Sequence, residues 1–166
     1  MHKRIFFHPE RCMVCQSCVL ACQMNSLGVS NVTEIPRDGK PIQRMRVTWF
    51  HGTPWTWKCQ QCVSAPCVEA CVSGSLRHGE GEGGVIHDRE TCAGCGACLL
   101  ACPFDAVTPD EDGDRVAKCD LCPEEDIPPC VKACQSGALV YQDPMLFAGN
   151  KRKKFLRGQK VHREGD

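Results

Sequence analysis

The sixteen cysteines of this 166-residue chain fall into four groups of four. Each group has the frame CxxC, a gap, then CxxxC, and the gap is two, four, two or seven residues long. Aligned on the last cysteine, the groups read CVLACQMNSL, CVEACVSGSL, CLLACPFDAV and CVKACQSGAL. Such self-similarity indicates internal duplication, and each copy is termed a cassette. In order, the cassettes contain Cys12, Cys15, Cys18 and Cys22; Cys59, Cys62, Cys67 and Cys71; Cys92, Cys95, Cys98 and Cys102; and Cys119, Cys122, Cys130 and Cys134.

The composition leaves little material for an ordinary hydrophobic core, because the chain has only six Phe, three Trp and one Tyr beside its sixteen Cys. This is typical of a disulfide scaffold or of metal centres that replace part of the core. The N-terminus MHKRIFFHPERC leaves no room for an apolar signal segment before Cys12, and Lys3-Arg4 is not a twin-arginine signal. No run of about 18 apolar residues occurs. We therefore expect a cytoplasmic protein without a membrane span, unless a signal-bearing partner exports it.

The spacing inside a cassette suits a cubane metal centre. Two cysteines in a CxxC step lie on a tight loop, and three in CxxCxxC wrap three corners of a cubane and leave the fourth open. The fourth cysteine lies about one helical turn beyond the third, so its thiolate points toward a second centre. We therefore expect a short helix in each cassette and an exchange of last cysteines between cassettes. A small residue precedes each last cysteine, as a helix packed between two centres requires: Ala21, Ala70, Ala101 and Ala133.

Other interpretations of the cysteines are weaker. Zinc sites also use CxxC, but they usually close one tetrahedron with two pairs a dozen or more residues apart. Disulfides within CxxC pairs would form strained small loops. Buried structural cysteines do not explain sixteen residues in register. The spacing favours four 4Fe-4S clusters.

At this point the cassettes resemble a known family. CAGCGACLLACPFDAV is similar to the bacterial two-cluster ferredoxins. The order of four cassettes, with KCQQCVSAPCVEAC and KCDLCPEEDIPPCVKAC stretched, resembles the four-cluster electron-transfer subunits of large redox enzymes. Those enzymes include molybdenum or tungsten oxidoreductases such as dimethyl sulfoxide reductase, formate dehydrogenase and aldehyde oxidoreductase, as well as hydrogenases and carbon monoxide dehydrogenase. The resemblance covers residues 5–142.

The resemblance implies an α+β fold in which the two-cluster ferredoxin fold is duplicated, with short helices and two-stranded hairpins around four 4Fe-4S clusters and little regular core. It also implies nested ligation, in which cassettes one and four share two clusters and cassettes two and three share two. The implied sets are cluster a, Cys12, Cys15, Cys18 and Cys134; cluster b, Cys22, Cys119, Cys122 and Cys130; cluster c, Cys59, Cys62, Cys67 and Cys102; and cluster d, Cys71, Cys92, Cys95 and Cys98.

Nested ligation divides the chain into units. Residues 1–27 plus 106–142 form an outer unit, residues 56–105 an inner unit, residues 28–55 a connecting insertion and residues 143–166 a basic C-terminal tail. The sequence departs from the family after the last cysteine of each cassette, where proline is usual. Because proline turns the chain away from a cluster, its loss predicts looser local structure with the ligands intact. Only Cys102-Pro103 keeps the proline, and the other three positions are Gln23, Val72 and Gln135.

Short strands are expected between the cassettes, where they would form two-stranded hairpins. The β-branched and aromatic runs that predict them are residues 4–7, 84–87, 115–117 and 138–141. In the insertion, residues 44–50 predict a further strand and residues 51–54 a turn.

Two features beside the cysteines bear on the metal centres. Trp55 and Trp57 stand just before Cys59, where they either shield a centre from water or fill the small core. Gly94 and Gly96 let the backbone of the third cassette approach its centre, whereas the first cassette has larger residues in that loop. We therefore expect these two centres to differ in reduction potential.

Charge is unevenly distributed although the formal net charge is zero. Residues 1–58 carry eight Lys and Arg against three Asp and Glu, residues 59–142 carry five against fourteen, and residues 143–166 carry seven against three. Each oxidised 4Fe-4S core with four thiolates adds about −2, so four clusters add about −8. The basic ends are either solvated faces or a docking surface for an acidic partner. The tail accordingly either extends into solvent or packs on a partner subunit.

Nothing outside the cassettes indicates substrate chemistry. The six histidines are scattered, and GEGEGG at residues 79–84 lacks the spacing of a nucleotide-binding loop and predicts a hairpin loop instead. No aromatic residues are interleaved in an extended basic face, so we expect no nucleic-acid binding. Because all sixteen cysteines are assigned as ligands, we expect a non-catalytic subunit.

The favoured function is the relay of single electrons through four clusters, between a large catalytic oxidoreductase subunit and another donor or acceptor. Tungsten or molybdenum aldehyde oxidoreductases and carbon monoxide dehydrogenase are the favoured partner types, because the chain is short for the family. One alternative is a free polyferredoxin that diffuses between enzymes. A more distant one is a zinc-stapled interaction module. Self-association is left open.

Overall fold

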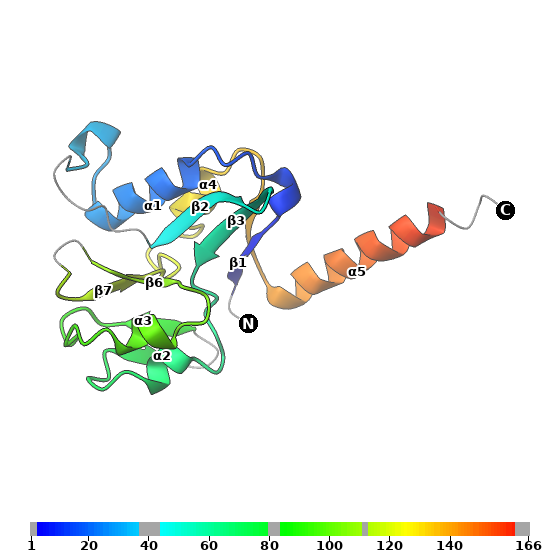
Figure 1. The fold of residues 1–166 in the computed structure, drawn as a ribbon. Coiled ribbons are helices and arrows are strands. Elements are labelled where there is room, and N and C mark those ends of the chain that lie inside the picture. Colours follow the sequence, from blue (N-terminus) through cyan, green and yellow to red (C-terminus); the bar gives the residue numbers. More distant parts are fainter. Residues whose placement is uncertain (1–2, 37–43, 80–83, 111–112, 162–166) are drawn as a thin grey trace.

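Short helices and paired strands make up most of the fold, and one longer helix points away from the rest (Figure 1). The computed structural model describes residues 3–36, 44–79, 84–110 and 113–161. The two ends of the cassette region lie together, whereas the C-terminal helix leaves the body of the molecule (Figure 1). The predicted combination of short helices and two-stranded hairpins is confirmed.

Each sheet in the described ranges is one antiparallel pair of strands. Three pairs join consecutive strands, and the fourth joins the two ends of the cassette region, with Arg4 opposite Gln142 and Phe7 opposite Leu139. This fourth pair brings the first and last cassettes together. The pairs are β1 (Arg4–Phe7) with β8 (Leu139–Gln142), β2 (Met45–Phe50) with β3 (Thr53–Lys58), β4 (Leu76–His78) with β5 (Val85–His87), and β6 (Val107–Pro109) with β7 (Val116–Lys118).

The predicted strands are present with shifts of no more than one residue at each end. The turn predicted at residues 51–54 is wrong in its second half, because Thr53 and Pro54 begin β3. His51 and Gly52 alone make the turn, and their φ angles of 48° and 75° suit a two-residue hairpin turn. Pro54 is tolerated because a strand of a two-stranded sheet has one unpaired side. In the loop predicted between β4 and β5, residues 80–83 lie outside the described residues.

Each cassette contains a helix that carries its third cysteine, as predicted. Two of these helices begin with a proline, Pro66 or Pro129, whose fixed φ and missing N–H suit the first helical turn. The helices pack in pairs that join first to fourth cassette and second to third. They are α1 (Ser17–Leu27), α2 (Pro66–Glu69), α3 (Ala97–Ala101) and α4 (Pro129–Lys132). The 3-10 turns η1 (Pro9–Arg11) and η2 (Val32–Glu34) lie before and after α1.

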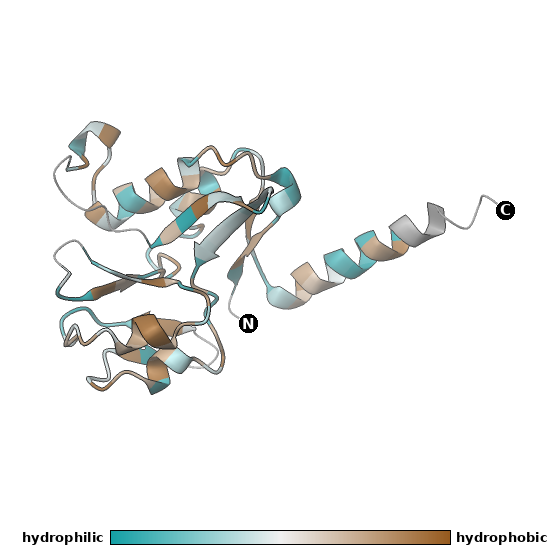
Figure 2. Ribbon diagram, viewed as in Figure 1, coloured by the Kyte–Doolittle hydropathy of each residue, from teal (hydrophilic) through white to brown (hydrophobic). Residues whose placement is uncertain are grey.

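Two small hydrophobic cores correspond to these helix pairs. The first joins Leu76, Val85 and Val107 with cysteines of the second and third cassettes. The second joins Ile5 and Leu139 with cysteines of the first and fourth cassettes, and the β2 residues Met45 and Val47 complete it. Brown segments concentrate on α2 and α3 in Figure 2. Cysteine side chains therefore take up a large share of both cores.

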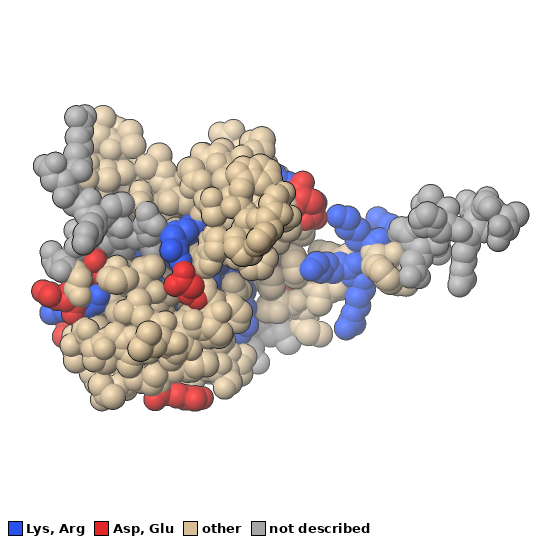
Figure 3. All heavy atoms as spheres, viewed as in Figure 1, with Lys and Arg blue, Asp and Glu red and all other residues tan. Residues whose placement is uncertain are grey.

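The C-terminal tail contains an 18-residue helix, α5 (Pro144–Val161), which the sequence analysis described only as a basic tail. The Asp143 carboxylate accepts a bond of 2.7 Å from the Met145 N–H and so caps the first turn. Phe147 stacks on Phe6 with ring centroids 4.0 Å apart, which anchors the helix to β1. Beyond this anchor, Lys and Arg side chains gather along the helix, as the blue atoms in Figure 3 show.

Candidate metal centres

Cysteines of the first and fourth cassettes line one pocket. Cys22 of α1 lines this pocket together with three cysteines of the fourth cassette, Cys119, Cys122 and Cys130. The electrostatic interactions of Cys22 are accordingly strongest with Cys119 and then Cys122. The remaining lining is largely apolar and includes Ile5, Met45, Leu121, Pro128 and Pro129.

Several other thiols also interact with a thiol of a second cassette. Cys18 interacts electrostatically with Cys134, which lies more than a hundred residues later, and with Cys12 of its own cassette. Between the second and third cassettes the interacting sets are Cys67 with Cys59 and Cys102, and Cys98 with Cys71 and Cys92. All sixteen cysteines lie in the described ranges, and no disulfide joins any two of them there.

The CxxC loops share a backbone feature. The residue before the second cysteine has positive φ in every cassette: 55° at Val14, 52° at Gln61, 65° at Gly94 and 66° at Leu121. In cassettes one and three the residue after the second cysteine repeats this, at 65° for Gln16 and 72° for Gly96. A left-handed residue curls the chain, which holds successive cysteines on one side of the loop.

Backbone N–H groups donate to several of the cysteine sulfurs. In the CxxC loops, the Val14 N–H donates to Cys12 Sγ and the Gln61 N–H to Cys59 Sγ, each with a nitrogen–sulfur distance of 3.4 Å. After the last cysteine, Leu76 N–H donates to Cys71 Sγ and Leu139 N–H to Cys134 Sγ, each at 3.3 Å. Leu76 and Leu139 occupy the same position of the repeat, which gives that repeated spacing a physical role. Such bonds stabilise negative charge on sulfur.

Burial shapes the acidity of the thiols. It raises the pKa of Cys18 to about 11 and of Cys22 to about 12, and neighbouring thiols add to the effect. These groups therefore favour the protonated form unless a cationic centre binds them. Cys71 differs: burial acts to raise its pKa, but hydrogen bonds from the Ser75 hydroxyl and the Leu76 N–H outweigh it and lower the pKa to about 7.

The donor set fits an iron–sulfur cubane better than a single ion. Within the described ranges, no group of three or more His, Cys, Asp or Glu side chains is placed to hold one metal ion. Sulfurs around one zinc must each lie about 2.3 Å from the same atom. The thiolates of a cubane each bind a different iron, so they need not converge on one atom. Four cysteines from two cassettes line the pocket beside Cys22, which is the number of ligands that one cubane takes.

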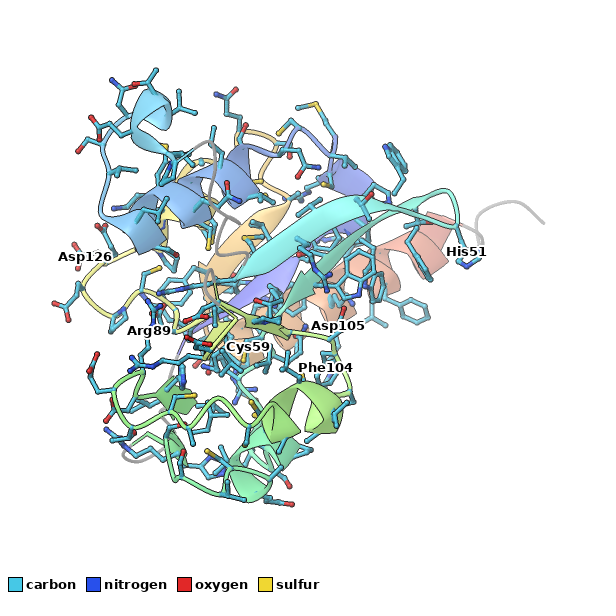
Figure 4. All side chains as sticks on the ribbon, turned by 60° about the vertical axis from the view of Figure 1, so that its left-hand side comes forward. His51, Cys59, Arg89, Phe104, Asp105 and Asp126 are labelled. Carbon is cyan, nitrogen blue, oxygen red and sulfur yellow. The ribbon has the colours of Figure 1, made fainter. Side chains whose placement is uncertain are left out.

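Other predicted residues fall around these centres. Trp55 is half exposed and Trp57 packs edge-on against Phe50, so Trp55 does not fill the core. The first five residues of the seven-residue gap in the fourth cassette form a surface loop, with Asp126 at its outer edge (Figure 4), whereas Pro128 is buried and Pro129 begins α4. Two buried cations, Lys58 and Lys118, are not evident from the sequence, although each directly precedes a CxxC pair.

Comparison with known proteins agrees with this chemistry. Residues 50–144 match the family described as 4Fe-4S dicluster domain. An uncharacterised ferredoxin of Methanocaldococcus jannaschii is 36% identical over 93% of this chain and 81% of its own length. An iron-sulfur protein of Rhodospirillum rubrum is 32% identical over 84% of this chain and 81% of its own. The B subunit of the anaerobic dimethyl sulfoxide reductase of Haemophilus influenzae is 29% identical over 82% of this chain and 71% of its own.

The chain therefore belongs to the 4Fe-4S dicluster domain family. It is a ferredoxin-like iron-sulfur protein, which confirms the 4Fe-4S cofactor predicted from the cysteine spacing. No helix in the described ranges is long and apolar enough to cross a membrane.

Proposed function

We propose that the chain binds four 4Fe-4S clusters in the nested sets a to d, so that the outer unit holds clusters a and b and the inner unit holds c and d. The observation that carries this proposal is the cavity where Cys22 of the first cassette faces three thiols of the fourth. A cassette that bound its own last cysteine would place Cys22 beside Cys18 instead. The interaction of Cys18 with Cys134 supports the same exchange.

Contacts between the sets support a single row of clusters in the order a, b, c, d. Each neighbouring pair of sets is joined by one pair of interacting thiols: Cys18 with Cys130, Cys59 with Cys119, and Cys67 with Cys98. When bound, a 4Fe-4S cluster supplies reversible one-electron chemistry. A row in which neighbouring ligand sets interact suits the passage of single electrons from one end of the protein to the other.

The residues of the chain hold and tune this row. Cysteine thiolates bind the iron, backbone N–H groups such as those of Leu76 and Leu139 stabilise sulfur charge, and the two small cores limit water access. All sixteen cysteines are used as ligands, so the chain itself carries no cysteine nucleophile and acts as a non-catalytic subunit.

The row would connect a large catalytic oxidoreductase subunit to a further donor or acceptor. Support comes from similar proteins that are themselves subunits of such enzymes, as the B subunit of dimethyl sulfoxide reductase is. From the family resemblance of the cassette order, we favour a tungsten or molybdenum aldehyde oxidoreductase or a carbon monoxide dehydrogenase as the catalytic partner. A free polyferredoxin is the second candidate function.

Anaerobic purification followed by iron and sulfide analysis tests the cluster count. About sixteen iron and sixteen sulfide per chain are expected for four clusters. Zinc without labile sulfide would contradict the proposal and favour a zinc-stapled module.

Isolation of the native complex under mild, anaerobic conditions tests the partnership. A stoichiometric large metalloenzyme subunit is expected in the same fraction. A monomer that exchanges electrons with several unrelated enzymes would instead show a free polyferredoxin.

A further inference from the structure

Two lysines are buried in the part of the chain that the structure describes, and they occupy equivalent places. Lys58 and Lys118 each directly precede the first cysteine of a stretched cassette, at the ends of β3 and β7. Their exposed fractions are only 5% and 3%, and no arginine in the described ranges is buried to this degree. Burying a charged ammonium is costly unless opposite charge or polar groups surround it.

Lys118 joins the two units. Its Nζ donates to the Val85 carbonyl at 2.6 Å and to the Cys119 carbonyl at 2.8 Å. Gln61 makes a parallel connection, because its amide Nε2 donates to the same Cys119 carbonyl and its Oε1 accepts from the Val85 N–H, both at 2.8 Å. Val85 belongs to the inner unit and Cys119 to the outer one. The ammonium of Lys118 therefore lies at the junction between the units.

Lys58 lies at the same junction. It lines the cavity of the cluster b ligands, and its Nζ has one hydrogen-bond partner among the described residues, Gln60 Oε1 at 3.4 Å. Burial lowers the pKa of Lys58, and the cysteines that act against this effect are Cys119, Cys59 and Cys130. A neutral amide at that distance compensates little of the charge, so the cysteine sulfurs are its main counterpart. Figure 4 places Cys59 near the centre of the molecule.

Each lysine thus faces ligands of both middle clusters. Lys58 interacts with Cys59 of set c and with Cys119 and Cys130 of set b, and Lys118 interacts with Cys67 of set c and Cys119 of set b. Lys58 and Lys118 are the only buried lysines in the described ranges, so no other lysine described there lies in a buried position beside the thiols of sets a and d.

We propose that Lys58 and Lys118 form an electrostatic bridge between clusters b and c that raises the reduction potentials of these two clusters above those of a and d. The inference rests on the proposed nested ligation. Reduction adds one negative charge to a cluster, and a nearby positive charge in a poorly hydrated site stabilises that added charge. Clusters b and c are therefore reduced before clusters a and d. The two lysines also couple the outer unit to the inner one electrostatically.

The test is a redox titration of the full-length, anaerobically prepared protein, followed by electron paramagnetic resonance. The variants are Lys58→Met and Lys118→Met, singly and together, because Met keeps most of the stem and removes the charge. Lys132→Met is the control: Lys132 also lies two residues from a cysteine ligand, but its side chain is half exposed and paired with Glu125 at 2.6 Å. Water screens such a charge.

In the double variant, the two highest of four potentials should fall, each by at least a tenfold change in the reduction equilibrium, or 59 mV for a one-electron couple. The two lowest potentials and all four potentials of Lys132→Met should stay within a third of that change. Unchanged potentials in the double variant, or equal shifts of all four, would overturn the bridge.

Cluster loss is measured in the same samples by iron analysis. If the Met variants lose iron, Lys58→Gln and Lys118→Gln, which keep a hydrogen-bond donor, are titrated in their place. Loss of iron from the Gln variants as well would show a structural role and overturn the proposal. Wild-type protein with fewer than four reducible clusters would instead contradict the nested ligation on which the inference rests.

Discussion

The loops of the first and third cassettes have the same backbone shape but different residues. In the third, glycine occupies both left-handed positions, Gly94 and Gly96, at φ of 65° and 72°. In the first, Val14 and Gln16 hold the same conformation at 55° and 65°, which is unusual for residues with a Cβ and costly for a β-branched one. The loop shape is therefore set by the cysteine spacing. The two cassettes place different types of residue in the same left-handed conformation.

Space explains the glycine of the third cassette. A Cβ at Gly94 would lie 1.8 Å from the carbonyl oxygen of Asp114, which is backbone and cannot rotate away. Tertiary contacts explain the first cassette. Val14 packs on the hydrophobic core that contains cysteines of the first and fourth cassettes. The Gln16 side chain donates a hydrogen bond of 2.8 Å to the Val47 carbonyl in β2. The third cassette thus has glycine at this positive φ because there is no room for a Cβ. The first cassette has larger residues there because their side-chain contacts compensate for the strain.

Gly94→Ala should have the largest effect on this comparison. The clash with Asp114 and the left-handed backbone together should cost about 3 kcal/mol, and cluster d should be lost. Iron analysis should then fall from about sixteen to about twelve atoms per chain. Val14→Ala is the matched control and should keep full iron content. A Gly94→Ala protein with unchanged iron would refute the spatial explanation.

Gln16→Ala should have an intermediate effect. It leaves the Val47 carbonyl without its side-chain donor while the positive φ remains, which should destabilise the outer unit by about 1 to 3 kcal/mol. The measurement is the temperature at which cluster absorbance is lost under anaerobic conditions. Gln16→Glu, which has nearly the same size but cannot donate, should behave like Gln16→Ala. Stability equal to wild type in both variants would mean that this bond does not hold the loop.

The smallest effect is expected from the choice between Gly and Ala at position 14. Val14→Gly removes both the packing and the backbone strain, whereas Val14→Ala removes packing alone. The Gly variant should therefore be more stable than the Ala variant by about 1 kcal/mol. Both are compared in the same thermal assay. At the aligned position 94 the same Gly to Ala difference should be far larger, and equal differences at the two positions would remove the contrast between the cassettes.

Much of this architecture is predictable from the sequence because the cassette spacing is so restrictive. The helices that carry the third cysteines and the strands β1, β5, β7 and β8 are where the repeat and the short apolar runs place them. By contrast, β3 is not predicted, because Pro54 and the two tryptophans are typical of a turn and a filler segment. Its register becomes evident only from the pairing with β2, which local patterns do not encode.

The buried lysines show a second limit. Lys58 and Lys118 look like ordinary surface residues in a sequence, because lysine is rarely buried. Their burial follows from contacts with residues far away in the sequence, such as that of Lys118 with Val85, and no local pattern carries that information. The same holds for α5, whose anchor depends on Phe147 reaching Phe6 at the opposite end of the chain. Long-range pairing of this kind is what the structure adds.

The central claim, nested ligation, is tested most directly by two matched sets of four Cys→Ser substitutions. Both sets replace Cys12, Cys15 and Cys18. The first-cassette set also replaces Cys22, whereas the cluster a set replaces Cys134 instead. Nested ligation predicts that the cluster a set loses one cluster and keeps about twelve iron atoms, whereas the first-cassette set damages clusters a and b and keeps about eight. The opposite ranking, with about twelve iron atoms retained when the intact cassette is removed, would contradict it.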